Sequence, residues 1–200
     1  MQRSIRAAAV ALMWVSSGWG LAFAQATDLR TPQSFDNIAD KTERSRAQFV
    51  EAGKVIQSPR CLNCHPNGDR PTQGNDMHLH VPMVVRGPAD KGATALRCMT
   101  CHQAANFEPA GVPGHPLWHL APVSMAWQGK SLGQICEQIK DRQRNGGKSL
   151  AQIQEHMAHD TLVGWGWKPG GNRAPAPGTQ AAFGQLVEAW IANGAACPPV

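Results

Sequence analysis

Two copies of the pattern Cys-x-x-Cys-His constrain this chain of 200 residues more than any other feature. The first runs from Cys61 to His65, and the second runs from Cys98 to His102. On one helical turn, two cysteines at this spacing can reach the two vinyl groups of a porphyrin, and the next histidine can bind its iron. The pattern therefore predicts two covalently bound haem c groups, one attached to Cys61 and Cys64 and the other to Cys98 and Cys101.

The histidine of each pentad, His65 or His102, is expected to be the proximal ligand of its haem iron. Two other chemistries use closely spaced cysteines. Zinc sites bring two Cys-x-x-Cys units onto one metal, usually about 15–20 residues apart, whereas a longer, loop-rich segment separates Cys64 from Cys98. A thioredoxin-like dithiol needs a strand and helix context that is absent here. Haem is favoured, and zinc and dithiol chemistry remain the alternatives.

The first 24 residues have the pattern of a secretory signal peptide. Arg3 and Arg6 form a positive region, residues 7–15 are apolar, and Ala22-Phe23-Ala24 predicts cleavage after Ala24. Polar and glycine residues at 16–20 end the apolar stretch before it could span a bilayer. No later segment is apolar enough for a membrane span, so the mature chain is expected to be soluble and exported, in a bacterium to the periplasm.

Two cysteines remain outside the pentads, Cys136 and Cys197. Export places the chain in an oxidising compartment, where an isolated cysteine pair is most simply interpreted as a disulfide. Neither residue has a sequence neighbour that would make a reactive thiolate, which is the alternative. The pair is therefore expected to connect a central helix to the C-terminal segment.

Composition favours one folded domain that does not bind nucleic acid. The chain is 42% apolar, which argues against disorder, and its net charge of +5 is scattered without a basic stripe. Residues 25–200 suit a single dihaem cytochrome c domain, with a first haem unit over about 34–90 and a second over about 91–200.

The pattern of apolar residues, caps and breakers predicts a mainly α, dihaem cytochrome c-like fold, with short helices and long ordered loops around two covalently attached haems. Helices are expected from about Ser34 or Asp36 to Gln57, after caps at Ser131 and Ser149, and over about 180–192. The last helix should pack on the first. Residues 77–85 are expected to be extended, and the proline-rich segment 108–122 to be an ordered loop.

The ligand opposite each proximal histidine decides whether an iron only passes electrons or also binds a small molecule. His156 is the first candidate, because it lies on the apolar face of the helix that Ser149 caps and is expected to project into the core. His78 and His80 come next, because an extended segment presents both on one face. A second group of candidates comprises His119, Met125, His115 and His159. Arg60, Arg70, Arg86 and Arg97 are candidate partners of the haem propionates.

Several blocks of the sequence resemble a known bacterial family. These blocks are residues 64–74, 84–87, 118–122, 135–136, 145–147 and 162–167. Together they resemble bacterial proteins labelled as a subunit of isoquinoline 1-oxidoreductase. That resemblance implies association with a molybdenum hydroxylase, from which a cytochrome c component accepts electrons. Since every cysteine is already assigned, no [2Fe–2S] site remains, and this chain would be the electron outlet of such a complex.

The leading hypothesis is an exported, soluble dihaem c-type cytochrome that is itself non-catalytic. It would accept electrons from a periplasmic oxidoreductase such as a molybdenum hydroxylase and pass them to the respiratory chain. The alternative is a haem enzyme or small-ligand sensor with one open iron coordination site.

Overall fold

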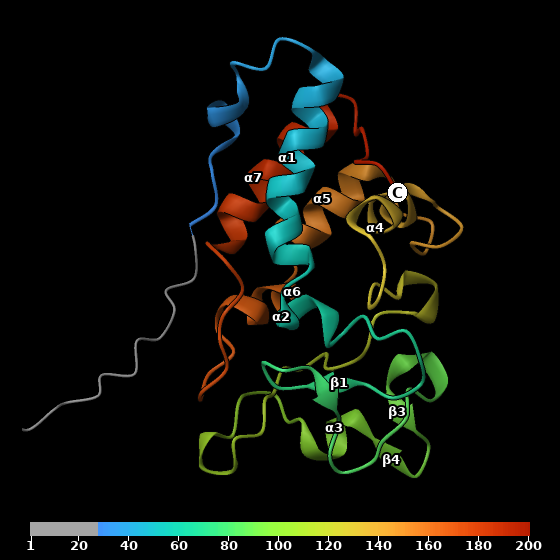
Figure 1. The fold of residues 1–200 in the computed structure, drawn as a ribbon. Coiled ribbons are helices and arrows are strands. Elements are labelled where there is room, and N and C mark those ends of the chain that lie inside the picture. The colour runs from blue at the N-terminus through green and yellow to red at the C-terminus, as the bar shows by residue number, and fades with distance from the viewer. Residues whose placement is uncertain (1–27) are drawn as a thin grey trace, which may run out of the picture.

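The computed structural model describes residues 28–200, so the predicted signal peptide and its cleavage site lie outside the described residues. This part of the chain is mainly helical, with seven short α-helices joined by loops. Figure 1 shows two regions, a helical half and a loop-rich lobe below it. The lobe is residues 67–118, and the helical half contains the rest. Among residues 28–200, none of the helices combines the length and the apolar character that a bilayer crossing requires.

The four longest helices form the frame of the helical half: α1 (Lys41–Ile56), α4 (Leu132–Lys140), α5 (Leu150–His159) and α7 (Gln180–Ala192). Helix α7 packs against α1 on one side and α5 on the other (Figure 1). Phe49 of α1 and Trp190 of α7 meet in the core with ring centres 4.8 Å apart. The predicted bounds of α7 and its packing on the first helix are confirmed.

The first helix begins later than the sequence pattern predicted. A short 3₁₀ turn, η1 (Pro32–Phe35), comes first, and α1 begins only after Asp40, whose side chain accepts a hydrogen bond from the Glu43 amide at 2.8 Å. This N-cap fixes the start of the helix. Val50 is 52% exposed although it is apolar, because one residue of helix rotates it about 100° away from buried Phe49.

The predicted cap at Ser131 and the predicted capping box at Ser149 are confirmed, and the structure shows a capping box at Ser131 as well. Ser131 accepts a hydrogen bond from the Gln134 amide before α4, and Ser149 accepts one from the Gln152 amide before α5. In each case the glutamine side chain bonds back to the serine amide at 2.9 Å. These reciprocal bonds satisfy amides that a helix start leaves unpaired, so each start is fixed by local sequence.

The predicted disulfide between Cys136 and Cys197 is confirmed. It ties buried Cys136 in α4 to the C-terminal segment that follows α7. Gly133 lies one turn earlier, where an added Cβ would lie 2.4 Å from the carbonyl oxygen of Pro199. Only glycine therefore lets the C-terminal segment lie this close to α4.

The lobe contains only short elements. Two antiparallel ribbons are formed by β1 (Thr72–Gln73) with β2 (His78–Leu79) and by β3 (Gly92–Ala93) with β4 (Leu96–Arg97). The other elements are α3 (Cys98–Cys101) and the 3₁₀ turns η2 (Pro88–Asp90) and η3 (Glu108–Ala110). The extended segment expected over 77–85 is therefore a strand only at His78–Leu79, and the expected loop over 108–122 has no α-helix.

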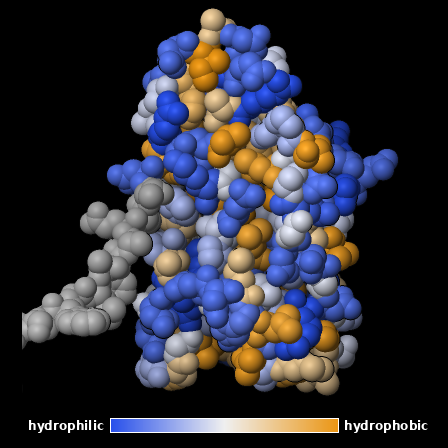
Figure 2. Space-filling view, in the orientation of Figure 1, coloured by the Kyte–Doolittle hydropathy of each residue, from blue (hydrophilic) through white to orange (hydrophobic). Residues whose placement is uncertain are grey.

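The lobe has no apolar core of its own. Between Asn67 and Trp118, the only buried residues are Thr72, Arg86, Gly92 and Gly114. Its large apolar side chains lie at the surface, and the more exposed of them are Leu79, Val81, Met83, Phe107 and Leu117. Figure 2 shows apolar residues reaching the surface at this end of the molecule. Hydrophobic burial among its own side chains therefore does not stabilise this region.

Arg86 holds the lobe together and joins it to the helical half. Its guanidinium forms an ion pair with Asp90 at 2.9 Å and donates to the carbonyl oxygens of Pro66, Gly68 and Ala121. These bonds occupy both terminal nitrogens and leave only the buried Nε without a partner. Arg86 does not line the cavity of the first pentad, so its bonds assign it a structural role. The predicted boundary between haem units near residue 90 falls inside the lobe.

Candidate functional site

The first pentad opens on a cavity at the junction of the two regions. Cys61 belongs to α2 (Pro59–Leu62), which continues from α1 almost at once, and Cys64 and His65 follow in the next turn. All three line a cavity of about 210 Å³. Its other walls are mostly apolar and come from α5, α6 (Thr161–Gly164), η5 (Trp165–Trp167) and the segment 118–127.

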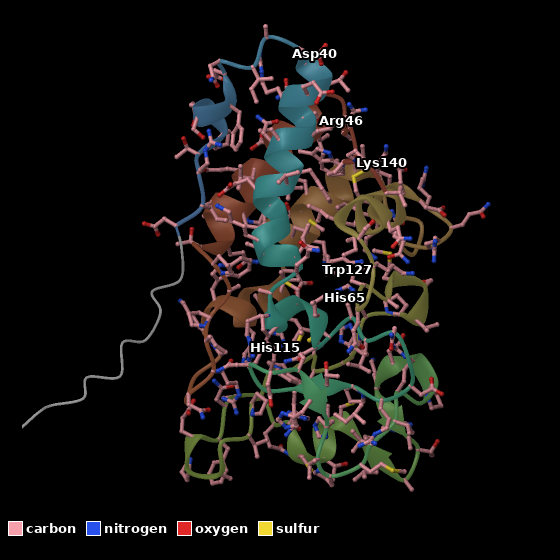
Figure 3. The ribbon with its side chains drawn as sticks, viewed as in Figure 1. Asp40, Arg46, His65, His115, Trp127 and Lys140 are labelled. Carbon is pink, nitrogen blue, oxygen red and sulfur yellow. A yellow bond between two sulfur atoms is a disulfide. The ribbon has the colours of Figure 1, made fainter. Side chains whose placement is uncertain are left out.

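His65 is held by two contacts from the segment 118–127. Its Nδ1 donates a hydrogen bond to the Met125 carbonyl oxygen at 2.7 Å, and the Trp127 ring stacks on it with centres 3.5 Å apart (Figure 3). Burial lowers the pKa of His65 to about 4, so the imidazole is neutral at pH 7. The backbone carbonyl fixes the tautomer and leaves Nε2 free, as is common for metal-binding histidines.

The two thiols beside His65 are not activated. Burial raises the pKa of Cys61 to about 12 and that of Cys64 to about 11, so both are protonated at neutral pH. A redox dithiol needs a lowered pKa, and these thiols show the opposite. Across residues 28–200, no three His, Cys, Asp or Glu side chains converge on a point where they could hold a metal ion. Neither zinc nor dithiol chemistry gains support.

Arg60 lies at the cavity wall as a buried cation without a counter-ion among the described residues. Its terminal nitrogen donates to the Gly74 carbonyl at 2.8 Å and to Asn75 Oδ1 at 3.1 Å, but its buried Nε has no partner. Burial lowers the pKa of this guanidinium because the charge loses hydration. A carboxylate bound in the cavity would supply the missing partner, and a haem propionate is such a group.

The second pentad repeats the arrangement of the first around a different helix turn. Cys98 and Cys101 bound α3, and His102 caps its C-terminal end. His102 Nδ1 donates to the Pro113 carbonyl oxygen at 2.7 Å, and the Trp118 ring stacks on the imidazole with centres 4.6 Å apart and planes 12° apart. In both His65 and His102, therefore, Nδ1 donates to a backbone carbonyl oxygen, a tryptophan stacks on the ring, and Nε2 has no hydrogen bond among the described residues.

Trp118 connects the two sites. It stacks on His102 and also lines the cavity that contains His65. Its edge contacts the Trp165 ring at 4.9 Å between centres, and Trp165 Nε1 donates to Asn106 Oδ1 at 2.9 Å. One aromatic side chain therefore spans from the first cavity to the second pentad.

Comparison with known proteins finds no match. No family model fits the chain, and neither a curated protein nor a solved structure is significantly similar. The interpretation of both pentads therefore depends on their own residues and geometry.

Three of the candidate distal ligands line the first cavity: His156, His119 and Met125. His156 does not project into the core as expected. Its side chain is 42% exposed at the cavity wall, and its Nδ1 lies 3.3 Å from Asp160 Oδ2. Partial burial lowers its pKa, and the Asp160 carboxylate acts in the opposite direction. His119 Nδ1 bonds the Leu117 carbonyl oxygen at 2.5 Å, so both histidines keep Nε2 free.

Met125 occupies a different position from the two histidines. Its carbonyl oxygen accepts the hydrogen bond from His65 Nδ1, so its backbone lies behind the imidazole, on the side opposite to Nε2. A thioether attached there is less suited to reach the far face of a metal bound at Nε2 than His156 or His119. Met125 is buried and belongs to the apolar core.

The other candidate histidines lie outside the cavity. His80 lies beside His102, whereas His78 bonds the Asp76 carboxylate at 2.6 Å and is exposed. Both ring nitrogens of His115 are engaged, because Nδ1 accepts from the Leu117 amide and Nε2 bonds Thr161 Oγ1. His159 is exposed on α5, with Glu155 as its nearest charged neighbour.

Sequence reasoning did not single out the two stacking tryptophans or Asp160. Trp127 stacks on a histidine 62 positions earlier and Trp118 on one 16 positions earlier, so no common spacing marks them. Asp160 lies four residues after His156, a spacing that places side chains together on a helix and was available in the sequence.

Proposed function

We propose that this chain is an exported dihaem c-type cytochrome that transfers electrons. The observation that carries this proposal is the shared geometry of the two pentads. In each pentad, a histidine directly follows two free cysteines. Its Nδ1 donates a hydrogen bond to a backbone carbonyl oxygen, and a tryptophan ring stacks parallel to the imidazole. Cys61, Cys64 and His65 would hold one haem, and Cys98, Cys101 and His102 the other. When bound, each haem supplies one-electron chemistry through its iron.

The absence of an apolar core in the lobe supports the proposal that a second group binds there. About fifty residues fold here around two ribbons and one helical turn, with their apolar side chains exposed. Domains of this size usually need a disulfide, a metal or another stabilising group, and the protein's disulfide lies in the helical half. A flat apolar cofactor attached to Cys98 and Cys101 would give side chains such as Leu79 and Phe107 a surface to cover.

The position of Trp118 supports electron transfer rather than two independent sites. The indole touches His102 and the first cavity at once, and Trp165 packs on its edge. The remaining walls of the first cavity are mainly aliphatic and aromatic, which suits the apolar ring of a bound haem.

His156 is our first choice for the sixth ligand at the first site. It faces the same cavity as His65, and Asp160 fixes its Nδ1 while also capping α6 through bonds to the Leu162 and Val163 amides. A carboxylate on the far nitrogen orients a ligating imidazole and raises its basicity. His119 is the competing ligand, because it lines the same cavity with a free Nε2.

The proposed electron donor is a periplasmic oxidoreductase of the molybdenum hydroxylase class, and the acceptor is a component of the respiratory chain. The donor class comes from the family resemblance of the sequence, and the compartment from the signal-peptide pattern. The cysteines are divided between the two pentads and the disulfide, so substrate oxidation would take place on another chain.

The decisive experiment is expression together with c-type cytochrome maturation machinery, followed by intact mass and pyridine haemochrome measurements. We expect two covalent haems in the parent protein. Cys61→Ala/Cys64→Ala and Cys98→Ala/Cys101→Ala should each retain one. A product without covalent haem would refute the proposal, and two haems in either double variant would refute the assignment of the attachment sites.

Carbon monoxide separates an electron carrier from an enzyme or sensor with an open iron. We expect the reduced parent protein not to bind carbon monoxide promptly at either site. His156→Ala should open the first site and bind it, whereas His159→Ala, a change on the exposed side of the same helix, should behave like the parent. Prompt binding by the parent would support the haem enzyme or sensor hypothesis instead.

A further inference from the structure

Two histidine rings from different segments approach each other in the lobe. His80 follows β2, and His102 ends α3. Their ring centres are 5.9 Å apart and their planes are inclined at 67°, with the edge of one ring toward the other. No hydrogen bond between these two imidazoles explains this approach, since each Nδ1 is bonded elsewhere.

His80 is fixed at three atoms. Its backbone amide donates to the Pro71 carbonyl oxygen at 3.0 Å, and its own carbonyl oxygen accepts from Arg70 Nη2 at 3.1 Å. Its ring Nδ1 donates to the Pro82 carbonyl oxygen at 2.9 Å. These bonds hold the backbone and select the tautomer in which Nε2 is unprotonated, which is the form that binds a metal.

His102 is prepared in the same way. The Pro113 carbonyl oxygen holds Nδ1, and Trp118 covers one flat face of the ring. A metal binds an imidazole in the plane of the ring through nitrogen, so this stacking does not block Nε2. Both histidines therefore offer the same nitrogen, and neither uses it in a hydrogen bond among the described residues.

We infer that His80 is the second axial ligand of the iron at the Cys98/Cys101 site, opposite His102. This inference rests on the proposed dihaem function. An imidazole nitrogen lies about 2 Å from a bound metal and the ring centre roughly 1 Å further, so two rings on opposite faces of one iron have centres about 6 Å apart. The observed separation of 5.9 Å fits that arrangement.

The inferred ligand comes from the segment between the two pentads. His80 follows the first pentad in sequence but would bind the iron at the second. The ribbon that precedes it is anchored on the first pentad itself: Thr72 Oγ1 donates to Asn63 Oδ1 at 2.7 Å, and Asn63 Nδ2 donates to the Gly74 carbonyl at 2.9 Å. Asn63 lies between Cys61 and Cys64. The inferred pair therefore ties the second site to the backbone of the first.

His78 provides a matched control. It lies two residues earlier on the same ribbon and pairs with Gln73 across it. Its side chain is 47% exposed and its Nδ1 bonds the exposed Asp76 carboxylate. It makes no aromatic contact with His102. Replacing it removes a neighbouring histidine without touching the inferred ligand.

The test uses the full-length holoprotein and the variants His80→Ala, His80→Met and His78→Ala. Haem content is measured first, and then the absorption and electron paramagnetic resonance spectra of the oxidised protein. His80→Ala should keep both haems but convert one of the two from low to high spin. That haem should then bind carbon monoxide when reduced, and added imidazole should restore its low-spin spectrum. His78→Ala should match the parent.

His80→Met keeps the test informative if the alanine variant folds poorly. A methionine ligand at this position should give a near-infrared sulfur-to-iron band and raise the potential of one haem only. Two haems with parent spectra in both His80 variants would overturn the inference and leave the proposed function intact. Absence of covalent haem from the parent would instead overturn the proposed function.

Discussion

The two regions of this protein are stabilised in opposite ways. The helical half buries Phe49, Ile135, Leu186 and Trp190 almost completely and adds a disulfide. The lobe buries an arginine and a threonine and exposes its apolar side chains. The first region combines extensive hydrophobic burial with a cross-link, whereas the second has polar contacts with its neighbour and, in our proposal, a bound group in place of an apolar core. The candidate sites lie at that junction and within the lobe.

The largest expected effect comes from removing the second attachment site. In Cys98→Ala/Cys101→Ala, we expect the lobe to lose protection from amide hydrogen exchange because nothing else fills its centre, while α1, α5 and α7 remain protected. Exchange measured by mass spectrometry on the parent and the variant provides the test. Equal protection of residues 67–118 in both proteins would show that the lobe is stable without a bound group.

Removing the disulfide tests the helical half, because it should destabilise that region and leave the candidate haem sites unchanged. Cys136 and Cys197 are separated by 61 positions, and a cross-link closing such a loop stabilises a fold by about 4 kcal/mol in the chain-entropy model. Cys136→Ala/Cys197→Ala should lower the free energy of unfolding measured by urea denaturation and far-ultraviolet circular dichroism. The haem spectra of the folded variant should match the parent. A change in those spectra would show that the two regions are less separate than we describe.

Arg86 tests the connection between the regions. Replacing it with methionine leaves the Asp90 carboxylate and three carbonyl oxygens without their donor, which should cost about 1–3 kcal/mol. We expect faster proteolysis within the lobe and a smaller change in the helical half. Lys91→Met, at an exposed lysine of the lobe, is the control and should cleave at the parent rate. Equal rates for Arg86→Met and Lys91→Met would show that Arg86 does not link the two regions.

The smallest expected effect concerns a helix start. Ser149→Ala removes the side chain that accepts from the Gln152 amide and should destabilise the helical half by about 1 kcal/mol. Ser149→Asp should restore most of the loss, because a carboxylate caps the same amide. Urea denaturation of the three proteins measures both effects. A loss in the aspartate variant equal to that in the alanine variant would show that capping is not the cause.

The same contrast explains what the sequence could predict. Helix α7 and the starts of α4 and α5 follow from local periodicity and from the capping residues Ser131 and Ser149, and their predictions are confirmed. The disulfide followed from counting cysteines. The start of α1 was predicted several residues too early, near Ser34 or Asp36, because the residue that caps this helix is Asp40.

At the candidate sites, too, local features could be predicted from the sequence and long-range contacts could not. The pentads are local patterns and could be recognised, but the carbonyls of Met125 and Pro113 and the two tryptophans reach them through long-range contacts that no spacing encodes. The expectation that His156 projects into the core came from one helix face and was wrong, because the side chain lies half-exposed at the cavity wall beside Asp160. Tertiary packing, rather than local propensity, decides these features.

The packing of α1 against α7 also determines when the helical core can form during synthesis. A chain made from its N-terminus releases α1 and both pentads well before α7, and the helical core cannot close until that last helix arrives. The segment that carries Cys61 and Cys64 therefore passes through a period in which it is not enclosed. An enzyme that acts on these two thiols has access to an open chain during that interval, before α7 completes the wall of their cavity through Phe183.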